Sequence, residues 1–320
     1  MLVNANKPEL WKADVARSID FYNRWFIEFA PRTWRQTRQG AVEQVISALT
    51  QVDHLRRLDI HCLKRSPEIL PILRMVTAPP IARDRLIGLS QTPPSLIKNI
   101  EIDGRLPSKL SSLEIDLELQ KIIDVIQRLI DIDLFPWFET GLVPEQTQVL
   151  RAATVVADRL CGAIADPVIR NAQEQRQLAT IQRWLQDKGY TLIESGSGIR
   201  FDQMPAASFA FHINVPVRQP NRNRQVNLPV DAAIMPSNAA LGTLPLLIEA
   251  KSAGDFTNTN KRRKEEATKM AQLRHTYGER IAFVLFLCGY FDSGYLGYEA
   301  AEGIDWVWEH RIDDLAEWGI

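Results

Sequence analysis

The spacing of apolar residues divides the chain into two parts of different character. Up to about residue 165, apolar side chains recur every three or four positions, which is the period of an amphipathic helix. The strongest example is Leu113–Ile130, and residues 8–51 and 146–165 show the same period. We expect breaks near Pro31 and at Gly162–Pro167, where helix-breaking residues occur. The pattern predicts a large, all-helical N-terminal region.

A second pattern begins at about residue 166. Asn171–Lys188 keeps the helical period and is followed by Gly189, a residue that often terminates helices. A further helix is predicted over Asn260–Tyr277. Apolar runs typical of strands occupy Tyr190–Glu194, Phe209–Val217, Asp231–Met235, Leu244–Glu249 and Ile281–Cys288, the last continuous enough to be a buried central strand. This order predicts an α/β (α+β) fold and is compatible with a mixed central sheet between helices.

Composition narrows the class of protein. The chain has 320 residues, of which 45% are apolar and 24% charged, as in a soluble globular protein of one large or two ordinary domains. It contains no apolar run of about 18 residues and no signal-peptide pattern near its start, so we expect no membrane span. Cys62, Cys161 and Cys288 are far apart and odd in number, which predicts neither a disulfide framework nor a zinc site. A reducing cytoplasm is the expected compartment.

The distribution of charge is more informative than the total of −1. Residues 292–320 hold eight acids and one arginine, a net of −7, so the rest of the chain carries +6. Charge of one sign gathered on one face favours binding to nucleic acid. We therefore expect the acidic C-terminal stretch to face away from any phosphate.

The candidate chemistry lies on two predicted strands. Glu249 and Lys251 are two residues apart, so on a strand they point to one face while Ala250 points to the other. Asp231 lies on the preceding predicted strand, which would bring it beside Glu249. Two carboxylates suit Mg²⁺, and Mg²⁺ with a lysine suits hydrolysis of a phosphodiester. The alternative is a solvated strand end that carries a surface ion pair. Glu174, on the helix before the sheet, is a candidate third metal ligand, with Glu194 as the alternative.

Three further stretches carry side chains that suit DNA. Arginine and lysine contact phosphates, and arginine and asparagine also read base edges. Each stretch has an alternative to DNA contact: a solvated face for the helix, a plain surface loop for the polar loop, and an internal Arg–Asp network for the segment beside the Pro-Pro pair. The candidates are Asn258, Asn260, Lys261, Arg262, Arg263 and Lys264 at the start of the helix after the motif, Arg218, Arg222 and Arg224 in a polar loop, and Arg83 and Arg85 beside a Pro-Pro pair.

Several stretches together resemble the XamI-type type II restriction endonucleases. They are "NKPELWKADVARSIDFYNRWF", "LRMVTAPPIARDRLIGL", "LIEAKSAGDFTNTNKRRKEEATK" and the strand with Asp231. The pattern Asp231…Glu249-Ala250-Lys251 is similar to the PD-(D/E)xK nuclease signature, although Val230 separates the proline from Asp231. The resemblance implies a restriction-endonuclease-like α/β/α core. It also implies Mg²⁺-dependent cleavage of double-stranded DNA at a short palindrome, with a DNA methyltransferase as functional partner.

These expectations combine into a two-part enzyme. Residues 1–165 would form a helical region that embraces DNA or dimerises, and residues 166–320 would form the nuclease domain, with Asp231, Glu249 and Lys251 as its catalytic set. A palindrome is most simply read by a two-fold homodimer. The alternatives are a repair or junction-resolving nuclease of the same fold, a DNA-binding module that does not cleave, and a helical scaffold protein.

Overall fold

The protein forms two compact units. The computed structural model describes the whole chain except residues 1, 195, 220–221 and 258, and the side chains of residues 222–224 and 259–262 also lie outside the description. One unit is Ala30–Val168, and the other joins Met1–Phe29 to Ile169–Ile320. Two long helices, α1 (Pro8–Gln51) and α8 (Gln146–Asp187), contribute to both units.

The two long helices correct the sequence prediction. Breaks are predicted near Pro31 and at Gly162–Pro167, yet α1 and α8 continue through both prolines. A proline inside a helix removes one backbone hydrogen bond, a cost of about 3 kcal/mol. Helices of 44 and 42 residues keep many other bonds and buried contacts on either side, which outweigh that loss.

The unit Ala30–Val168 is all helical, as predicted. Its short helices surround one apolar core, to which α6 contributes Leu119, Ile122 and Ile126. A capping box between Ser111 and Glu114 starts α6. The short elements are η1 (Asp53–Leu55), α2 (Ile60–Arg65), η2 (Pro67–Ile69), α3 (Leu70–Met75), α4 (Arg83–Ser90), α5 (Pro94–Asp103), α6 (Ser112–Leu129) and α7 (Trp137–Thr140). Among the described residues, no helix combines the length and apolar character that a membrane span requires.

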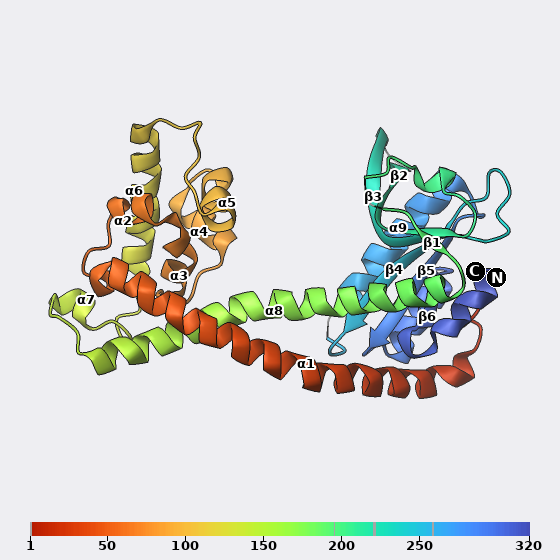
Figure 1. Ribbon diagram of the computed structural model, residues 1–320, viewed down its shortest axis with the longest axis horizontal. Helices are drawn as coiled ribbons and strands as arrows, with labels where there is room; N and C mark the ends of the chain where they lie inside the picture. Colours follow the sequence, from red (N-terminus) through yellow and green to blue (C-terminus); the bar gives the residue numbers. More distant parts are fainter. Residues whose placement is uncertain (1, 195, 220–221, 258) are drawn as a thin grey trace. The chain divides into compact units, whose positions relative to one another are not determined.

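The other unit is built on a six-stranded mixed sheet in the order β1-β2-β3-β4-β5-β6 (Figure 1). Strands β2, β3 and β4 are antiparallel neighbours, whereas β1 with β2, β4 with β5 and β5 with β6 are parallel. This mixed sheet with its helices confirms the predicted fold class. The elements are β1 (Thr191–Leu192), η3 (Phe201–Gln203), β2 (Ser208–Gln219), β3 (Arg222–Met235), β4 (Leu246–Ala253), α9 (Thr259–Tyr277), β5 (Ala282–Gly289), α10 (Ser293–Ala301), β6 (Asp305–Trp308) and η4 (Glu309–Trp318).

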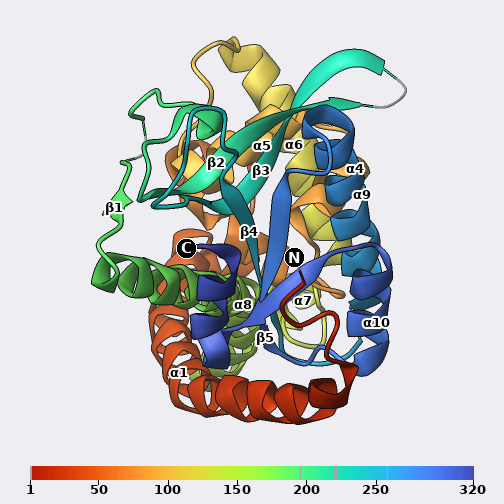
Figure 2. The ribbon, with the colours of Figure 1, turned by 90° about the vertical axis from the view of Figure 1, so that its right-hand side faces the viewer.

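The two faces of the sheet bury different helices (Figure 2). Ile248 of β4 packs in a cluster with Ile181 of α8, while Leu247 packs in a cluster with Leu273 of α9. Successive strand residues alternate between the faces. Ala250 packs on the α8 side, and the side chains of Glu249 and Lys251 contact α9. The predicted division of faces between Glu249 and Lys251 on one side and Ala250 on the other is confirmed.

The first 29 residues pack against the sheet rather than with the helical unit in which the sequence places them. The Asn4 amide donates to the Trp306 carbonyl at 2.8 Å, and the Trp11 ring meets the Trp306 ring edge to face at 5.5 Å. The Gly289 N–H donates to the Ser18 hydroxyl at 2.8 Å. The N-terminal segment thus covers the β5–β6 edge. Periodicity could not show this, because it identifies an apolar face but not its partner.

Candidate active site

Asp231 and the Glu249–Lys251 segment meet where two strands separate. The β3–β4 ladder ends at the pair Ala232–Ile248, while β4 continues alongside β5. The Ala250 N–H is therefore left without a β3 carbonyl. The Asp231 carboxylate takes that place and accepts this N–H at 2.7 Å. One hydrogen bond thus joins the two halves of the motif.

Glu249 is buried, and in the described part of the chain only one of its two carboxylate oxygens accepts hydrogen bonds. Its Oε1 accepts from Lys251 Nζ at 2.9 Å and from Lys269 Nζ at 2.6 Å. Its Oε2 is buried and has no hydrogen-bond partner among the described residues. A buried carboxylate oxygen without a donor is costly unless something else binds it. This oxygen is therefore available to a cation.

Burial and nearby charges shift the pKa values of Asp231 and Lys251. Burial raises the pKa of Asp231 to about 6, the Glu249 carboxylate adds to that rise, and the Ala250 N–H opposes it. Burial by itself would lower the pKa of Lys251, but the carboxylates of Glu249 and Glu266 outweigh it and raise that pKa. Lys251 is therefore an ammonium, and Asp231 stands in an excess of negative charge that a divalent cation would relieve.

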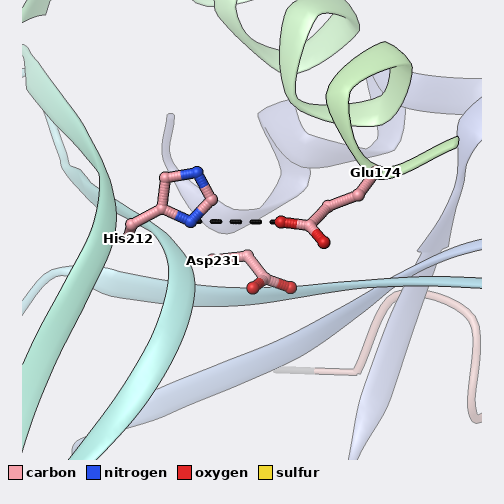
Figure 3. Close-up of side chains that lie close together, drawn as sticks. All are labelled: Glu174, His212 and Asp231. Atoms are coloured by element: carbon pink, nitrogen blue, oxygen red, sulfur yellow. Dashed lines mark ion pairs between the residues drawn. The ribbon is translucent and has the colours of Figure 1, made fainter. Parts of the chain in front are cut away.

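Glu174 and His212 form a cluster with Asp231 (Figure 3). One potential ligand atom from each of the three residues lies within 4.8 Å of the others, and His212 Nδ1 is 4.0 Å from Glu174 Oε1. His212 lies on β2 with φ 52°, a left-handed conformation that is uncommon outside glycine. The pairs flanking it, Phe211–Ala232 and Ile213–Val230, place it opposite Asp231.

The position of Glu174 depends on the next turn of α8. Gln177, three residues on, donates from Nε2 to the Phe286 carbonyl at 3.0 Å, and its Oε1 accepts from the Ser252 hydroxyl at 3.1 Å. Residues three apart on a helix share a face. The bonds of Gln177 to β5 and β4 therefore turn Glu174 toward the site. Glu194, the alternative ligand, is exposed and is not part of this cluster.

Two comparisons establish the family. The chain matches the XamI restriction endonuclease family over residues 53–308. The chain belongs to this family. It is also 52% identical over 314 residues to the type II restriction enzyme SalI of Streptomyces albus G, and the match covers 98% of each chain. The protein is therefore a restriction endonuclease, a hydrolase that cleaves DNA at specific sites, and the predicted family and activity are confirmed.

A comparison with solved structures adds nothing to that identification. Protein VC1899 from Vibrio cholerae has a TM-score of 0.29 and 14% identity to this chain. The match covers 90% of this chain and 56% of that longer one. So low a score supports no conclusion.

The donor set of this restriction endonuclease fits a divalent metal ion, which enzymes of this class generally use. Glu174 and Asp231 offer carboxylate oxygens within one cluster. Glu249 is not part of that cluster, but it offers its unpartnered Oε2 from the neighbouring strand β4. Oxygen donors suit Mg²⁺. The imidazole of His212 suits a transition metal better than Mg²⁺.

The residues predicted to contact DNA lie in varied surroundings. Arg83 donates to Glu101 at 2.7 Å, so it takes part in an internal ion pair, although with a different acid from the neighbouring Asp84. Arg263 lies 4.8 Å from the centre of the Tyr298 ring. The others with described side chains are exposed: Arg85, Arg218 and Lys264. Asn258 and the side chains of Arg222, Arg224, Asn260, Lys261 and Arg262 lie outside the described residues. Their contacts with DNA stay predictions.

Sequence reasoning missed three residues of the site. Lys269 and Glu266 belong to a basic helix for which the sequence suggests contact with DNA or, alternatively, a solvated face, yet both side chains contact the motif. His212 lies within a predicted strand and carries no local signal. The available signal for α9 was its spacing, since residues 266 and 269 are three apart and share a face.

Proposed function

We propose that the enzyme hydrolyses double-stranded DNA at a short palindrome in a Mg²⁺-dependent reaction, with Asp231, Glu249 and Lys251 as its catalytic residues. The observation that carries this proposal is the hydrogen bond from the Ala250 N–H to Asp231. It brings one carboxylate from β3 beside the Glu-x-Lys segment of β4. A surface ion pair would not require a carboxylate to take the place of a strand partner.

Each residue has a role that its surroundings support. Asp231 and Glu249 would hold the metal ion, with Glu174 as a third ligand from α8. When bound, Mg²⁺ lowers the pKa of a water molecule and neutralises charge on the scissile phosphate. Lys251 keeps its positive charge beside these carboxylates. Its ammonium group would position the attacking water and offset negative charge that develops on the phosphate.

The assembly follows from the substrate. A two-fold DNA site is matched by a two-fold protein, so we propose a homodimer in which the unit Ala30–Val168 helps to embrace DNA or to join the protomers. A restriction activity requires protected host sites, so a DNA methyltransferase would be the functional partner and the cytoplasm the site of action. Sedimentation of the enzyme with its cognate DNA tests the oligomer, and a monomer alone would contradict it.

Digestion of unmethylated plasmid or phage DNA tests the activity. Wild type, Asp231→Asn and Lys251→Ala are compared in Mg²⁺ and in EDTA. Discrete fragments from wild type in Mg²⁺ alone, and rates at least about a hundredfold lower from both variants, support the proposal. A smear of DNA fragments from wild type would contradict cleavage at a specific sequence. Cleavage that survives both substitutions would show that other residues carry the chemistry.

A further inference from the structure

Behind the catalytic lysine lies a pair of acids that the proposed chemistry does not use. Glu266 of α9 and Glu299 of α10 are both fully buried. Glutamates are almost never fully buried unless a partner compensates them. Glu266 has such partners, because the Tyr295 hydroxyl donates to its Oε2 at 2.8 Å and Lys251 Nζ lies 3.6 Å from its Oε1.

Glu299 is in a different state from Glu266. Both of its oxygens are buried, and the groups that act on its carboxyl are Glu266, Tyr295 and, through its charge, Arg263. Burial first, and then the neighbouring Glu266, raise the pKa of Glu299 to about 9. Two buried carboxylates side by side cannot both be ionised at neutral pH. Glu299 therefore keeps its proton and can donate a hydrogen bond to Glu266.

A protonated Glu299 also limits the negative charge around the motif. Lys251 and Lys269 supply two positive charges on the α9 side of β4, and Glu249 and Glu266 supply two negative charges. An ionised Glu299 would add a third negative charge inside the protein. A neutral Glu299 avoids that third charge, which would add to the negative charge of Asp231, and provides Glu266 with a donor.

One face of α9 thus holds both residues of the Glu-x-Lys segment. Glu266 lies against Lys251, and Lys269, three residues on, donates to Glu249 at 2.6 Å. Each helix residue has the opposite charge to the strand residue that it meets. The Lys251 side chain, only 20% exposed, is consequently held between Glu249 and Glu266.

We propose that Glu266 and Glu299 are positioning residues for the catalytic lysine: the buried carboxyl of Glu299 holds Glu266 by a hydrogen bond, and Glu266 holds the Lys251 ammonium at the end of β4. This inference rests on the proposed function only through the role of Lys251. Glu266 of α9 and Glu299 of α10 then support the reaction through Lys251, without contacting DNA or metal themselves.

The test compares three variants that separate a hydrogen-bond donor from a charge. Glu299→Gln keeps a neutral donor of the same size, Glu299→Leu removes the donor, and Glu266→Gln removes the charge that faces Lys251. Single-turnover cleavage in Mg²⁺ is measured on DNA that carries the site mapped with wild type. DNA binding is measured separately with Ca²⁺ in place of Mg²⁺.

We expect Glu299→Gln to cleave within about threefold of wild type, and Glu299→Leu and Glu266→Gln to cleave at least about tenfold more slowly with unchanged DNA affinity. Equal losses in Glu299→Gln and Glu299→Leu would overturn the proposal, because the donor would not matter. Wild-type rates in Glu299→Leu and Glu266→Gln would overturn it as well.

Two further measurements keep the outcome decisive. If Glu299→Leu fails to fold, the pH dependence of unfolding replaces it: wild type must lose stability relative to Glu299→Gln as pH rises from about 5 to about 9, and identical profiles would overturn the proposal. Lys251→Ala separates the two claims. A dead Lys251→Ala with an active Glu266→Gln overturns only the positioning role, whereas an active Lys251→Ala overturns the catalytic assignment and the positioning role with it.

Discussion

The helical unit and the sheet unit both bury charged side chains, but they compensate them differently. In the helical unit, Arg74 donates to both oxygens of Glu101 at 2.6 and 3.2 Å and Arg83 donates to the same carboxylate at 2.7 Å. The third nitrogen of the Arg74 guanidinium donates to the Ile81 carbonyl at 2.6 Å. In the sheet unit, more carboxyl groups than lysines gather around the motif: Asp231, Glu249, Glu266 and Glu299 with Lys251 and Lys269.

The difference agrees with a structural role for the Glu101 cluster and with the catalytic role that we propose for the cluster around the motif. Complete hydrogen bonding of buried charges is what a folded core requires. Around the motif there is an excess of negative charge, Glu249 has an unpartnered oxygen and the pKa of Asp231 is raised. A protein tolerates such an excess where a bound ligand can relieve it. Four predictions test this division, from the largest expected effect to the smallest.

Removing the negative charge of Asp231 should separate activity from stability. Asp231→Asn retains an oxygen for the Ala250 N–H but no charge for a metal, so we expect cleavage to fall at least about a hundredfold. The raised pKa of Asp231 means that the folded protein loses stability as pH rises from 3.8 through about 6. At pH 8 the metal-free variant should therefore be more stable than wild type by about 1–2 kcal/mol. Urea unfolding in EDTA measures this, and a less stable variant would contradict the functional reading of the cluster.

The matched substitution in the helical unit, Glu101→Gln, should lower stability and leave activity unchanged. Glu101→Gln leaves Arg74 buried without its counter-charge, so we expect a loss of about 3 kcal/mol in the free energy of unfolding. Cleavage per folded molecule should be unchanged. Unfolding curves and digestion at low temperature give both quantities, and a stable but inactive variant would show that Glu101 has a functional role.

The protonation of Glu299 should appear in the pH dependence of stability. Because burial and Glu266 raise the pKa of Glu299 to about 9 in the folded protein, stability should fall as pH rises from about 5 to about 9. One proton contributes at most about 1.4 kcal/mol per pH unit to that slope. Glu299→Gln should flatten it, and Glu101→Gln should not. Chemical denaturation at several pH values measures the slope.

The smallest effect is expected at His212. Its side chain is more than half exposed, and its φ of 52° suits glycine. His212→Gly should leave stability unchanged or raise it by about 0.5–1 kcal/mol. Cleavage in Mg²⁺ should fall by about tenfold or less, with a larger loss in Mn²⁺, which accepts imidazole more readily. Equal losses with both metals would argue against a ligand role for His212.

Much of the fold and part of the site could be predicted from the sequence. A period of two placed Glu249 and Lys251 on one face of β4, and the apolar run of β5 marked a buried central strand. Glu174 was also predicted, and it lies beside Asp231. Local patterns suffice here, because backbone geometry alone sets which side chains share a face.

Only the tertiary structure decided which groups meet across elements. Strand spacing does not show where β3 leaves β4, and that separation is what frees the Ala250 N–H for Asp231. The basic helix suggests contact with DNA or a solvated face in sequence, yet packing turns Glu266 and Lys269 of α9 toward the motif. Two prolines predicted breaks that the packed helices do not have. The chain by itself determined the elements and the residue types of the chemistry. The folded protein decided their charge balance, because electrostatic energies depend on burial and on partners distant in sequence.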